Sequence, residues 1–176
     1  MLKLIKLVLG LSICLQIIDA QDRKRTGDGR KFKLSPVESV KTNIPPTMDS
    51  ARLGADLLID GNLPKDGWRS TWTAWFKKNP SLIFDLGSEK RIGVIRVFYQ
   101  PWERSDELME VKVEVSNDGE NFVEFNEYVD FSSDREKGVW AEMDLRAVRA
   151  RYFRLSPKYR GWGNQWGEVE FWELRK

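Results

Sequence analysis

Histidine is absent from the 176 residues of the chain. This absence excludes Ser–His–Asp and Cys–His catalysis, and it excludes zinc sites built on imidazole. Cysteine is nearly absent as well, because the single one is Cys14, close to the N-terminus. A chain without further cysteines is common among exported bacterial proteins. It is less common among animal ectodomains, whose small domains often depend on disulfides.

Long hydrophobic runs are also missing, apart from one that extends from Leu7 to Ile18. This run follows a short basic start, and Ala20 is a small residue at a suitable cleavage point. A membrane-spanning helix needs roughly 20 apolar residues, so the segment predicts a signal peptide over residues 1–20. An uncleaved N-terminal anchor is the alternative. A lipid anchor on Cys14 is disfavoured because the apolar run continues past it. We expect a secreted or periplasmic protein, of bacterial origin.

A strong excess of charge of one sign is absent too. The chain has 29 basic and 27 acidic residues, which gives a net charge of +2. The one basic run, Arg23 to Arg25 with further basic residues to Lys33, lies in a segment containing Gly and Asp, and is typical of a solvated linker. The sequence therefore favours neither nucleic-acid binding nor membrane insertion.

The pattern beyond the leader is that of an all-β domain. Residues 109–115 alternate strictly between apolar and charged side chains, which predicts a strand with one buried face. A Ser-Asn-Asp-Gly turn follows at 116–119, and Phe122 and Phe125 then indicate a hairpin. Further strands are predicted at 81–86, 92–99, 139–145, 151–155 and 167–174, whereas 51–58 suits a helical turn or two. Residues 21–49, broken by three prolines, predict a linker and an irregular first strand. Short strands in this number indicate a β-sandwich or barrel over residues 50–176.

Tryptophan is the most informative residue type that the chain does contain. All eight tryptophans follow residue 67, and six of them form two clusters. Because tryptophan is large and carries an N–H group, it often occupies half-buried or ligand-facing positions. The first cluster holds Trp68, Trp72 and Trp75, the second holds Trp162, Trp166 and Trp172, and Trp102 and Trp140 stand alone.

Seven short motifs in a fixed order resemble the discoidin, or coagulation factor 5/8 type C, family, which includes many bacterial carbohydrate-binding modules. Together they cover about residues 50–174. The resemblance implies an eight-stranded, jelly-roll-like β-sandwich of the galactose-binding-like type. Members that bind animal membranes and cell surfaces usually carry a disulfide that this chain lacks, which favours the bacterial glycan-binding branch. The motifs are LIDGN (58–62), WRSTW (68–72), LIFDLG (82–87), IGVIRV (92–97), VEVSNDGENF (113–122), ARYFRL (150–155) and GEVEFWEL (167–174).

The resemblance also implies a structural calcium ion. Similar modules bind it with the Asp-Gly-Asn loop and with a glutamate that opens the last strand. In this sequence the ligands would be Asp60, Asn62 and Glu168, assisted by oxygens near Ser70 or Thr71. Ca²⁺ takes six to eight oxygen ligands in flexible geometry, which suits such a loop. The alternative is an Asx turn at Asp60, with Glu168 only capping the strand end.

A second set of residues combines aromatic rings with polar groups, as sugar binding requires. A ring covers the apolar face of a sugar, while polar side chains exchange hydrogen bonds with its hydroxyls. The resemblance places the ligand at the loop end of the sandwich. The candidate ligand-binding residues are Trp75, Trp102, Arg104, Trp162 and Asn164.

The remaining tryptophans receive structural interpretations. Trp140 and Trp172 lie in predicted strands, which favours packing. Trp72 is expected to fill the sandwich beside the calcium loop, and Trp68 and Trp166 stay unassigned.

These observations predict a secreted, non-catalytic protein that binds a glycan or polysaccharide. The alternative is a module of the same fold that binds a protein or a surface. Carboxylate pairs such as Glu168 and Glu170 exist, and glycoside hydrolysis needs only two carboxylates. A charged pair on a solvated strand is nevertheless the ordinary outcome in a chain with 32% charged residues. We therefore do not expect an enzyme.

Overall fold

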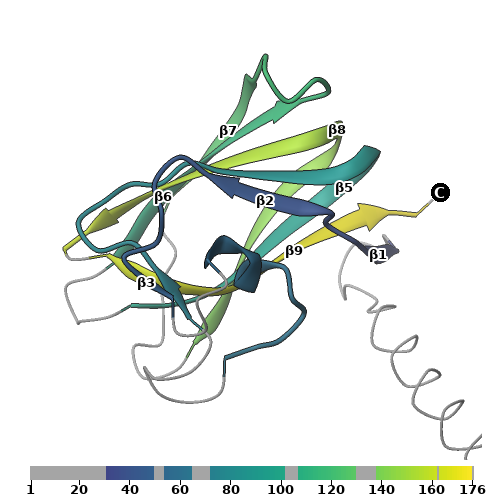
Figure 1. Ribbon diagram of the computed structural model, residues 1–176. Helices are drawn as coiled ribbons and strands as arrows, with labels where there is room; N and C mark the ends of the chain where they lie inside the picture. Colours follow the sequence, from purple (N-terminus) through teal and green to yellow (C-terminus); the bar gives the residue numbers. More distant parts are fainter. Residues whose placement is uncertain are drawn as a thin grey trace, which may run out of the picture.

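The computed structural model describes residues 31–49, 54–64, 72–101, 107–129, 138–161 and 163–175. Within these ranges the chain forms nine strands and one 3-10 helix (Figure 1). No helix there is long and apolar enough to cross a membrane. In chain order the elements are β1 (Phe32–Ser35), β2 (Ser39–Thr42), β3 (Met48–Asp49), η1 (Gly54–Leu58), β4 (Thr73–Ala74), β5 (Leu82–Pro101), β6 (Glu107–Ser116), β7 (Val123–Val129), β8 (Val139–Arg160) and β9 (Asn164–Leu174).

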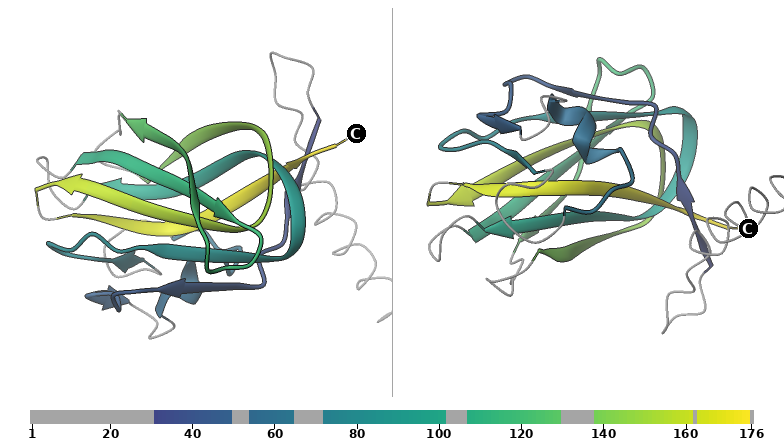
Figure 2. Two further views of the ribbon diagram at one scale, coloured as in Figure 1. Left: turned by 90° about the horizontal axis from the view of Figure 1, so that it is seen from above. Right: turned by 60° about the horizontal axis from the view of Figure 1, so that its bottom comes forward.

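Two long strands, β5 and β8, build both layers of a sandwich. They pair antiparallel from Leu82 to Tyr99 of β5, with register shifts after Asp85 and after Ile92. Both strands bend at the first register shift, which lies between Asp85 and Lys90 of β5. Before this bend, β5 pairs with β2, and the matching part of β8 pairs with β6. Beyond the bend, β5 pairs with β9. The first layer therefore has the order β2-β5-β8-β6-β7 and the second has β8-β5-β9-β4-β3, joined into one folded sheet (Figure 2).

The bend is held by a two-pronged ion pair. Arg151 of β8 donates from Nε and Nη2 to the two carboxylate oxygens of Asp85, at 2.8 and 2.9 Å. The same carboxylate accepts the N–H of Gly87, whose φ of 74° lies in the left-handed region that glycine adopts freely. Charge-assisted pairs of this geometry are among the stronger hydrogen bonds in proteins. Asp85 thus fixes the point at which β5 leaves the first layer.

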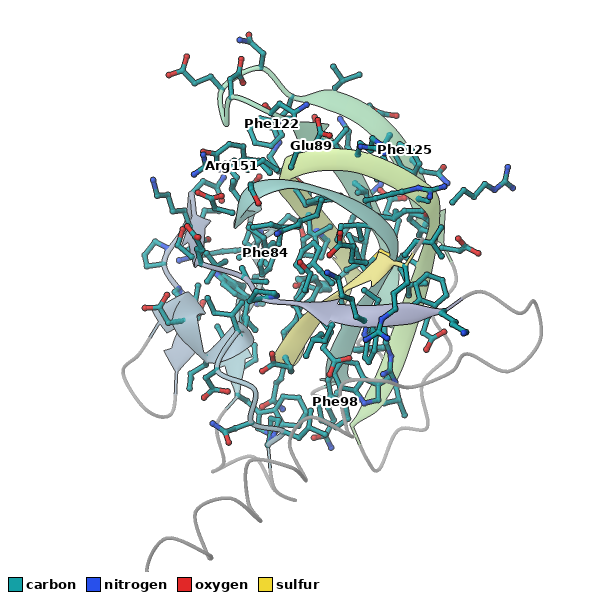
Figure 3. The ribbon with its side chains drawn as sticks, turned by 90° about the vertical axis from the view of Figure 1, so that its right-hand side faces the viewer. Phe84, Glu89, Phe98, Phe122, Phe125 and Arg151 are labelled. Atoms are coloured by element: carbon teal, nitrogen blue, oxygen red, sulfur yellow. The ribbon has the colours of Figure 1, made fainter. Side chains whose placement is uncertain are left out.

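The core lies between the two layers and consists of the side chains that point inward from alternating strand positions. Phe171 contacts Phe84 and Phe153, with ring centroids 5.2 and 5.3 Å apart. All three rings are fully buried, and burying a phenylalanine stabilises a fold by about 1.5–3 kcal/mol. Figure 3 shows Phe84 in the middle of the molecule and Phe122 and Phe125 near the β6–β7 hairpin.

The expected all-β sandwich is confirmed, and the alternating segment at 109–115 lies within β6. The segments 81–86 and 92–99 are parts of one strand, β5, and 139–145 and 151–155 are parts of β8. Sequence patterns separated them because charged and glycine residues at the bends resemble loop signals. The predicted hairpin from β6 to β7 is antiparallel, as expected.

Residues 21–49 were predicted to form a linker and an irregular first strand; of these the structure describes residues 31–49, which contain the three short strands β1, β2 and β3. β1 pairs with the end of β9, and β2 pairs with the start of β5. Phe32 of β1 is buried, and a Cβ at Gly93 would come within 2.5 Å of its ring. These strands are short, lie at sheet edges and are separated by prolines, so they carry little hydrophobic pattern.

The ion pair at the bend gives an acid-dependent stability. The hydrogen bond from Arg151 holds the pKa of Asp85 below its usual value of 3.8. A carboxyl whose pKa is lowered in the folded state stabilises the fold above its ordinary pKa, and this stabilisation is lost as pH falls through the lowered value. We expect Asp85→Asn to reduce the free energy of unfolding at pH 7 by about 1 kcal/mol. The deficit should shrink below pH 4.

Urea unfolding from pH 7 to pH 2 measures this. The matched control is Asp56→Asn, because Asp56 is exposed in η1. It should leave stability nearly unchanged at every pH. A deficit for Asp85→Asn that is equally large at pH 2 and pH 7 would show that the charge of Asp85 does not stabilise the bend.

Candidate functional site

Two loops that contain tryptophan begin and end at the same end of the sandwich. β5 ends at Pro101 and β9 begins at Asn164, and these two residues are partners in the sheet. β6 begins at Glu107 and β8 ends at Arg160, and these two are partners as well. The connections 102–106 and 161–163 therefore leave from adjacent strand ends. We call this end of the sandwich the loop end, and we include in it residues 74–76, at and just after the end of β4.

The connection from β8 to β9 is pinned against the chain that follows β4. Gly163 is buried and has a φ of 120°, and a Cβ at this position would lie 2.6 Å from the carbonyl oxygen of Trp75. Gly161 has a φ of 84°. Only glycine fits both the dihedral angle and the space at residue 163. The close approach of two backbones thus explains Gly163, and the left-handed dihedral angle explains Gly161.

The expectation that Trp75 faces a ligand is wrong, because its side chain is fully buried. Its Nε1–H donates to the carbonyl of Ile44 at 2.9 Å, and its ring belongs to the main core. The N–H of Phe76 is in turn bound by the hydroxyl of Thr47. The chain at 44–47 therefore covers Trp75, and neither edge strand β3 nor this cover was visible in the sequence.

Trp72 is buried, as expected, but it does not fill the space between the layers. It stacks on Phe98 with ring centroids 5.6 Å apart and an angle of 13°. Phe98 lies between Val97 and Tyr99, which point into the core, so its own ring points to the outer face of the second layer. Of these two residues, Trp75 and not Trp72 belongs to the core between the layers.

The structure also places three of the other tryptophans. Trp166, which the sequence left unassigned, is fully buried in the main core. Trp172 packs with Phe32 and Val94 in a second small cluster, as its strand position predicted. Trp140 is half-buried on the outer face, with the guanidinium of Arg96 4.4 Å from its ring centroid. Packing accounts for all three.

The structure describes only some of the proposed ligand-binding residues. Trp102, Arg104 and Trp162 lie outside the described residues, as does Trp68. Asn164 is described as the first residue of β9, with its backbone opposite Pro101. Their role in binding stays a prediction, since what the structure adds is the adjacency of the strand ends that flank them.

The sequence places Tyr159 and Gln165 in the aromatic and polar segment around Trp162, although they were not among the candidate ligand-binding residues. The hydroxyl of Tyr159 and the side-chain oxygen of Gln165 are buried and have no hydrogen-bond partner among the described residues. Burial raises the pKa of Tyr159, so the phenol stays protonated. Buried polar atoms are usually paired, and unpaired ones often mark functional positions. Only their position near Trp162 in the sequence could have indicated them.

The Asp60 loop has the geometry of an Asx turn. The Oδ1 of Asp60 accepts the N–H of Asn62 at 2.8 Å, and the side-chain amide of Asn62 donates to the carbonyl of Asp60 at 3.3 Å. Gly61 between them has a φ of 77°. The loop packs on β9, since a Cβ at Gly167 would lie 2.4 Å from Pro64. The turn is the arrangement that the sequence offered as the alternative to a metal ligand.

Glu168 reaches this turn from β9. Its Oε2 accepts the N–H of Gly61 at 3.1 Å, and its side chain is almost completely buried. Burial, together with the nearby charge of Asp60, raises the pKa of Glu168 to about 8. Two carboxylates and the carbonyls of a turn are thus brought together, and oxygen donors of this kind suit Ca²⁺.

The described part of this site is not a complete cage for a metal ion. Among the described residues, no group of three or more His, Cys, Asp or Glu side chains could hold one. Asn62 directs its amide nitrogen to a carbonyl, which leaves its oxygen as the atom available to a cation. Ser70 and Thr71 lie outside the described residues. The donors that are present fit calcium in type.

Solved structures with this arrangement of strands include several carbohydrate-binding modules. A truncated AlyQ "with CBM32 and alginate lyase domains" has a TM-score of 0.62 and 18% identity, over 84% of this chain and 34% of that chain. The family 32 module of NanJ from C. perfringens, solved with galactose, has a TM-score of 0.57 and 15% identity, over 77% and 93%. The lectin domain of lectinolysin, a mutant solved with Lewis b, has 0.60 and 18%, over 79% and 94%.

Identities this low show the fold alone, and a search of the curated proteins finds no match. The family is shown by the sequence itself. The model of the F5/8 type C domain matches residues 39–174, which begins at β2 and ends with β9. This span agrees with the structure in starting before residue 50. The chain therefore belongs to the F5/8 type C domain family, with a carbohydrate-binding-module-like fold.

Proposed function

We propose that this domain is a secreted, non-catalytic binding protein that recognises a glycan at the loop end. Trp102 and Trp162 would cover the apolar faces of sugar rings, while Arg104 and Asn164 would exchange hydrogen bonds with hydroxyl groups. Side chains with few rotamers lose little conformational entropy when they bind, which favours aromatic residues in such a role.

The observation that carries the proposal is the pairing of the strand ends that flank both loops. Pro101 lies opposite Asn164, so the chain enters the Trp102 loop beside the residue that leaves the Trp162 turn. Strand partners lie about 5 Å apart. Two loops anchored at this separation can present their aromatic rings to the same ligand. Gly163, wedged against the carbonyl of Trp75, fixes the second anchor.

The structural relatives support a saccharide as the ligand class. The NanJ module was solved with galactose, the AlyQ module with 4,5-unsaturated mannuronic acid, and the lectinolysin domain with Lewis b. These ligands differ in charge and size, so they support the class and not one sugar. The lyase of the truncated AlyQ is a separate domain, and this chain covers 34% of that structure. This division supports a binding role without catalysis.

We also propose that a structural calcium ion binds between the Asp60 loop and Glu168. A buried carboxylate beside a second one is unfavourable without a cation, and the raised pKa of Glu168 expresses this cost. Asp60, Asn62 and Glu168 would hold the ion. The ion would link the loop that follows η1 to β9, the strand whose first residue, Asn164, adjoins the loop end.

Removal of both proposed sugar-stacking rings tests the glycan site. The wild-type protein, applied to a broad glycan array, should bind at least one glycan. Trp102→Ala/Trp162→Ala should lose about tenfold or more of the affinity for it, because central aromatic residues dominate binding energy. Titration calorimetry with the glycan measures the loss, and circular dichroism verifies the fold.

Phe125→Ala is the matched control, because Phe125 is a partly exposed aromatic residue on β7. It should bind the glycan as the wild type does. An array without any bound glycan, combined with a protein recovered by pull-down, would favour a protein-binding module. Normal binding by the double tryptophan variant would refute the site.

Calcium should stabilise the protein through Glu168. At a calcium concentration 100 times the dissociation constant, a specific site adds about 2.7 kcal/mol to the free energy of unfolding. We expect millimolar calcium to raise the melting temperature of the wild type by several degrees, and EDTA to reverse this. Glu168→Gln should not respond to calcium. In EDTA at a pH above 8, where Glu168 is ionised, it should be at least as stable as the wild type, because it removes a buried negative charge beside Asp60.

Glu120→Gln serves as the control, since Glu120 is exposed in the β6–β7 turn. Its melting temperature should rise with calcium like that of the wild type. Equal responses of Glu168→Gln and the wild type would place the calcium elsewhere, and no response of the wild type would remove the calcium proposal.

A further inference from the structure

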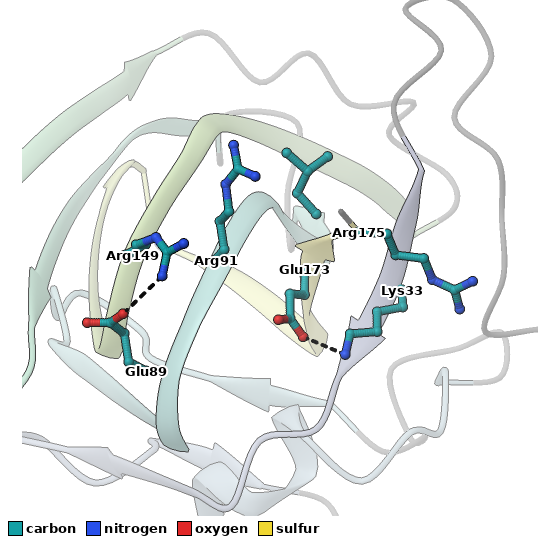
Figure 4. Close-up of a pocket in the computed structure, with 7 residues that line it drawn as sticks. Lys33, Glu89, Arg91, Arg149, Glu173 and Arg175 are labelled. Carbon is teal, nitrogen blue, oxygen red and sulfur yellow. Dashed lines mark hydrogen bonds and ion pairs between the residues drawn. The ribbon is translucent and has the colours of Figure 1, made fainter.

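A pocket opens at the end of the sandwich opposite the loop end (Figure 4). Its volume of about 480 Å³ is within the usual range for small-ligand sites. It lies where β5 bends and where β9 ends. β9 starts at the loop end and runs to Leu174 in the pocket wall, so about 30 Å separates the two ends. The pocket is therefore distinct from the proposed glycan site.

The pocket lining is rich in positive charge. Four basic and two acidic side chains line it, contributed by β1, β5, β8, β9 and the residue after β9. Leu174 is the one apolar residue of the lining. These side chains are Lys33, Arg91, Arg149 and Arg175 on the basic side and Glu89 and Glu173 on the acidic side.

Two of the arginines face each other directly. Arg91 of β5 and Arg149 of β8 are register partners in the antiparallel pair. Like charges in directly opposite positions destabilise a sheet, by a few tenths to about 1 kcal/mol. The side chain of Arg91 forms no ion pair or hydrogen bond in the described part of the chain. The fold therefore places two arginines at opposite register positions in the pocket lining, and of the two only Arg149 has a carboxylate partner.

The acidic residues of the pocket are already engaged by other partners. Glu173 pairs with Lys33 at 2.9 Å, and Glu89 pairs with Arg149 at 3.5 Å. The Arg149–Glu89 pair is long, and its side chains are 64% and 48% exposed, so it stabilises little. Figure 4 shows Arg91 between the two ion pairs. An incoming anion can therefore recruit Arg149 at low cost and bind Arg91 directly.

We propose that this pocket binds the carboxylate or sulfate group of an acidic saccharide, held by Arg91 and Arg149. Guanidinium groups bind pairs of oxyanion oxygens with two parallel hydrogen bonds, in planar carboxylates and in tetrahedral oxyanions alike, which suits either group. A bound anion would also remove the repulsion between the two arginines. That the rest of the ligand is a saccharide rests on the proposed function, whereas the anion site rests on the pocket alone.

The geometry disfavours larger anionic partners. Nucleic-acid binding typically uses 6–10 phosphate contacts along an extended basic surface. Here two of the four cations already pair with glutamates, and the site is a recess. A single charged group on a sugar matches it better.

Calorimetric titration at 50 mM salt tests the proposal with two probes, tetragalacturonate and a sulfated heparin tetrasaccharide, which separate carboxylate from sulfate. At least one should bind the wild type. Arg91→Gln should weaken this binding about tenfold, the loss expected for one charge-assisted contact. Lys41→Gln, which removes one exposed positive charge on β2, should change it less than about twofold. Glu89→Gln should strengthen binding, because it frees Arg149.

The glycan-site variant separates the two proposals. If Trp102→Ala/Trp162→Ala still binds the acidic tetrasaccharide and Arg91→Gln does not, the pocket is the site, whatever the loop end binds. If the tryptophan variant loses binding and Arg91→Gln retains it, the pocket inference fails and the loop-end function gains support. Binding of neither probe, or equal losses in Arg91→Gln and Lys41→Gln, would also overturn the pocket.

Discussion

The pairing of β5 with β8 is the constraint on which the rest of the molecule depends. Both strands bend from one layer into the other and pair on both sides of the bend, and the Asp85–Arg151 ion pair holds them there. Because the two layers share these strands, the position of each layer fixes that of the other. The strand ends that flank the tryptophan loops and the basic pocket at the bend are therefore parts of one framework.

β9 contributes side chains both to the core and to the candidate calcium site. The register shift between Phe98 and Tyr99 places Gly167 as an extra residue in β9. A bulge of this kind redirects the side chains on its two sides. Trp166 consequently points into the core, while Glu168 reaches the turn at Gly61. A single inserted residue, Gly167, thus separates a purely structural tryptophan from a candidate calcium ligand two positions along.

The sequence was a good guide to the fold and a weaker guide to the site. Strict alternation at 109–115 identified β6, because only one face of that strand is buried. The short edge strands β1 and β2 escaped, since they gain their stability from neighbours and not from their own pattern. The burial of Trp75 and the packing partner of Trp72 were not predictable, because they depend on residues distant in sequence, such as Ile44 and Phe98. The basic pocket has no sequence signal, since four separate chain segments contribute its side chains.

The adjacency of the two ends of the domain has a consequence for presentation. The N–H of Arg175, just past β9, donates to the carbonyl of Lys31, just before β1, at 2.9 Å. The chain therefore enters and leaves the sandwich at one end, and the strand ends that flank the tryptophan loops lie at the opposite end. A surface or partner domain joined at the first end would leave the tryptophan loops facing the medium. A force that pulls the two ends of the domain apart would separate β1 from β9 one hydrogen bond at a time before it acts on the core.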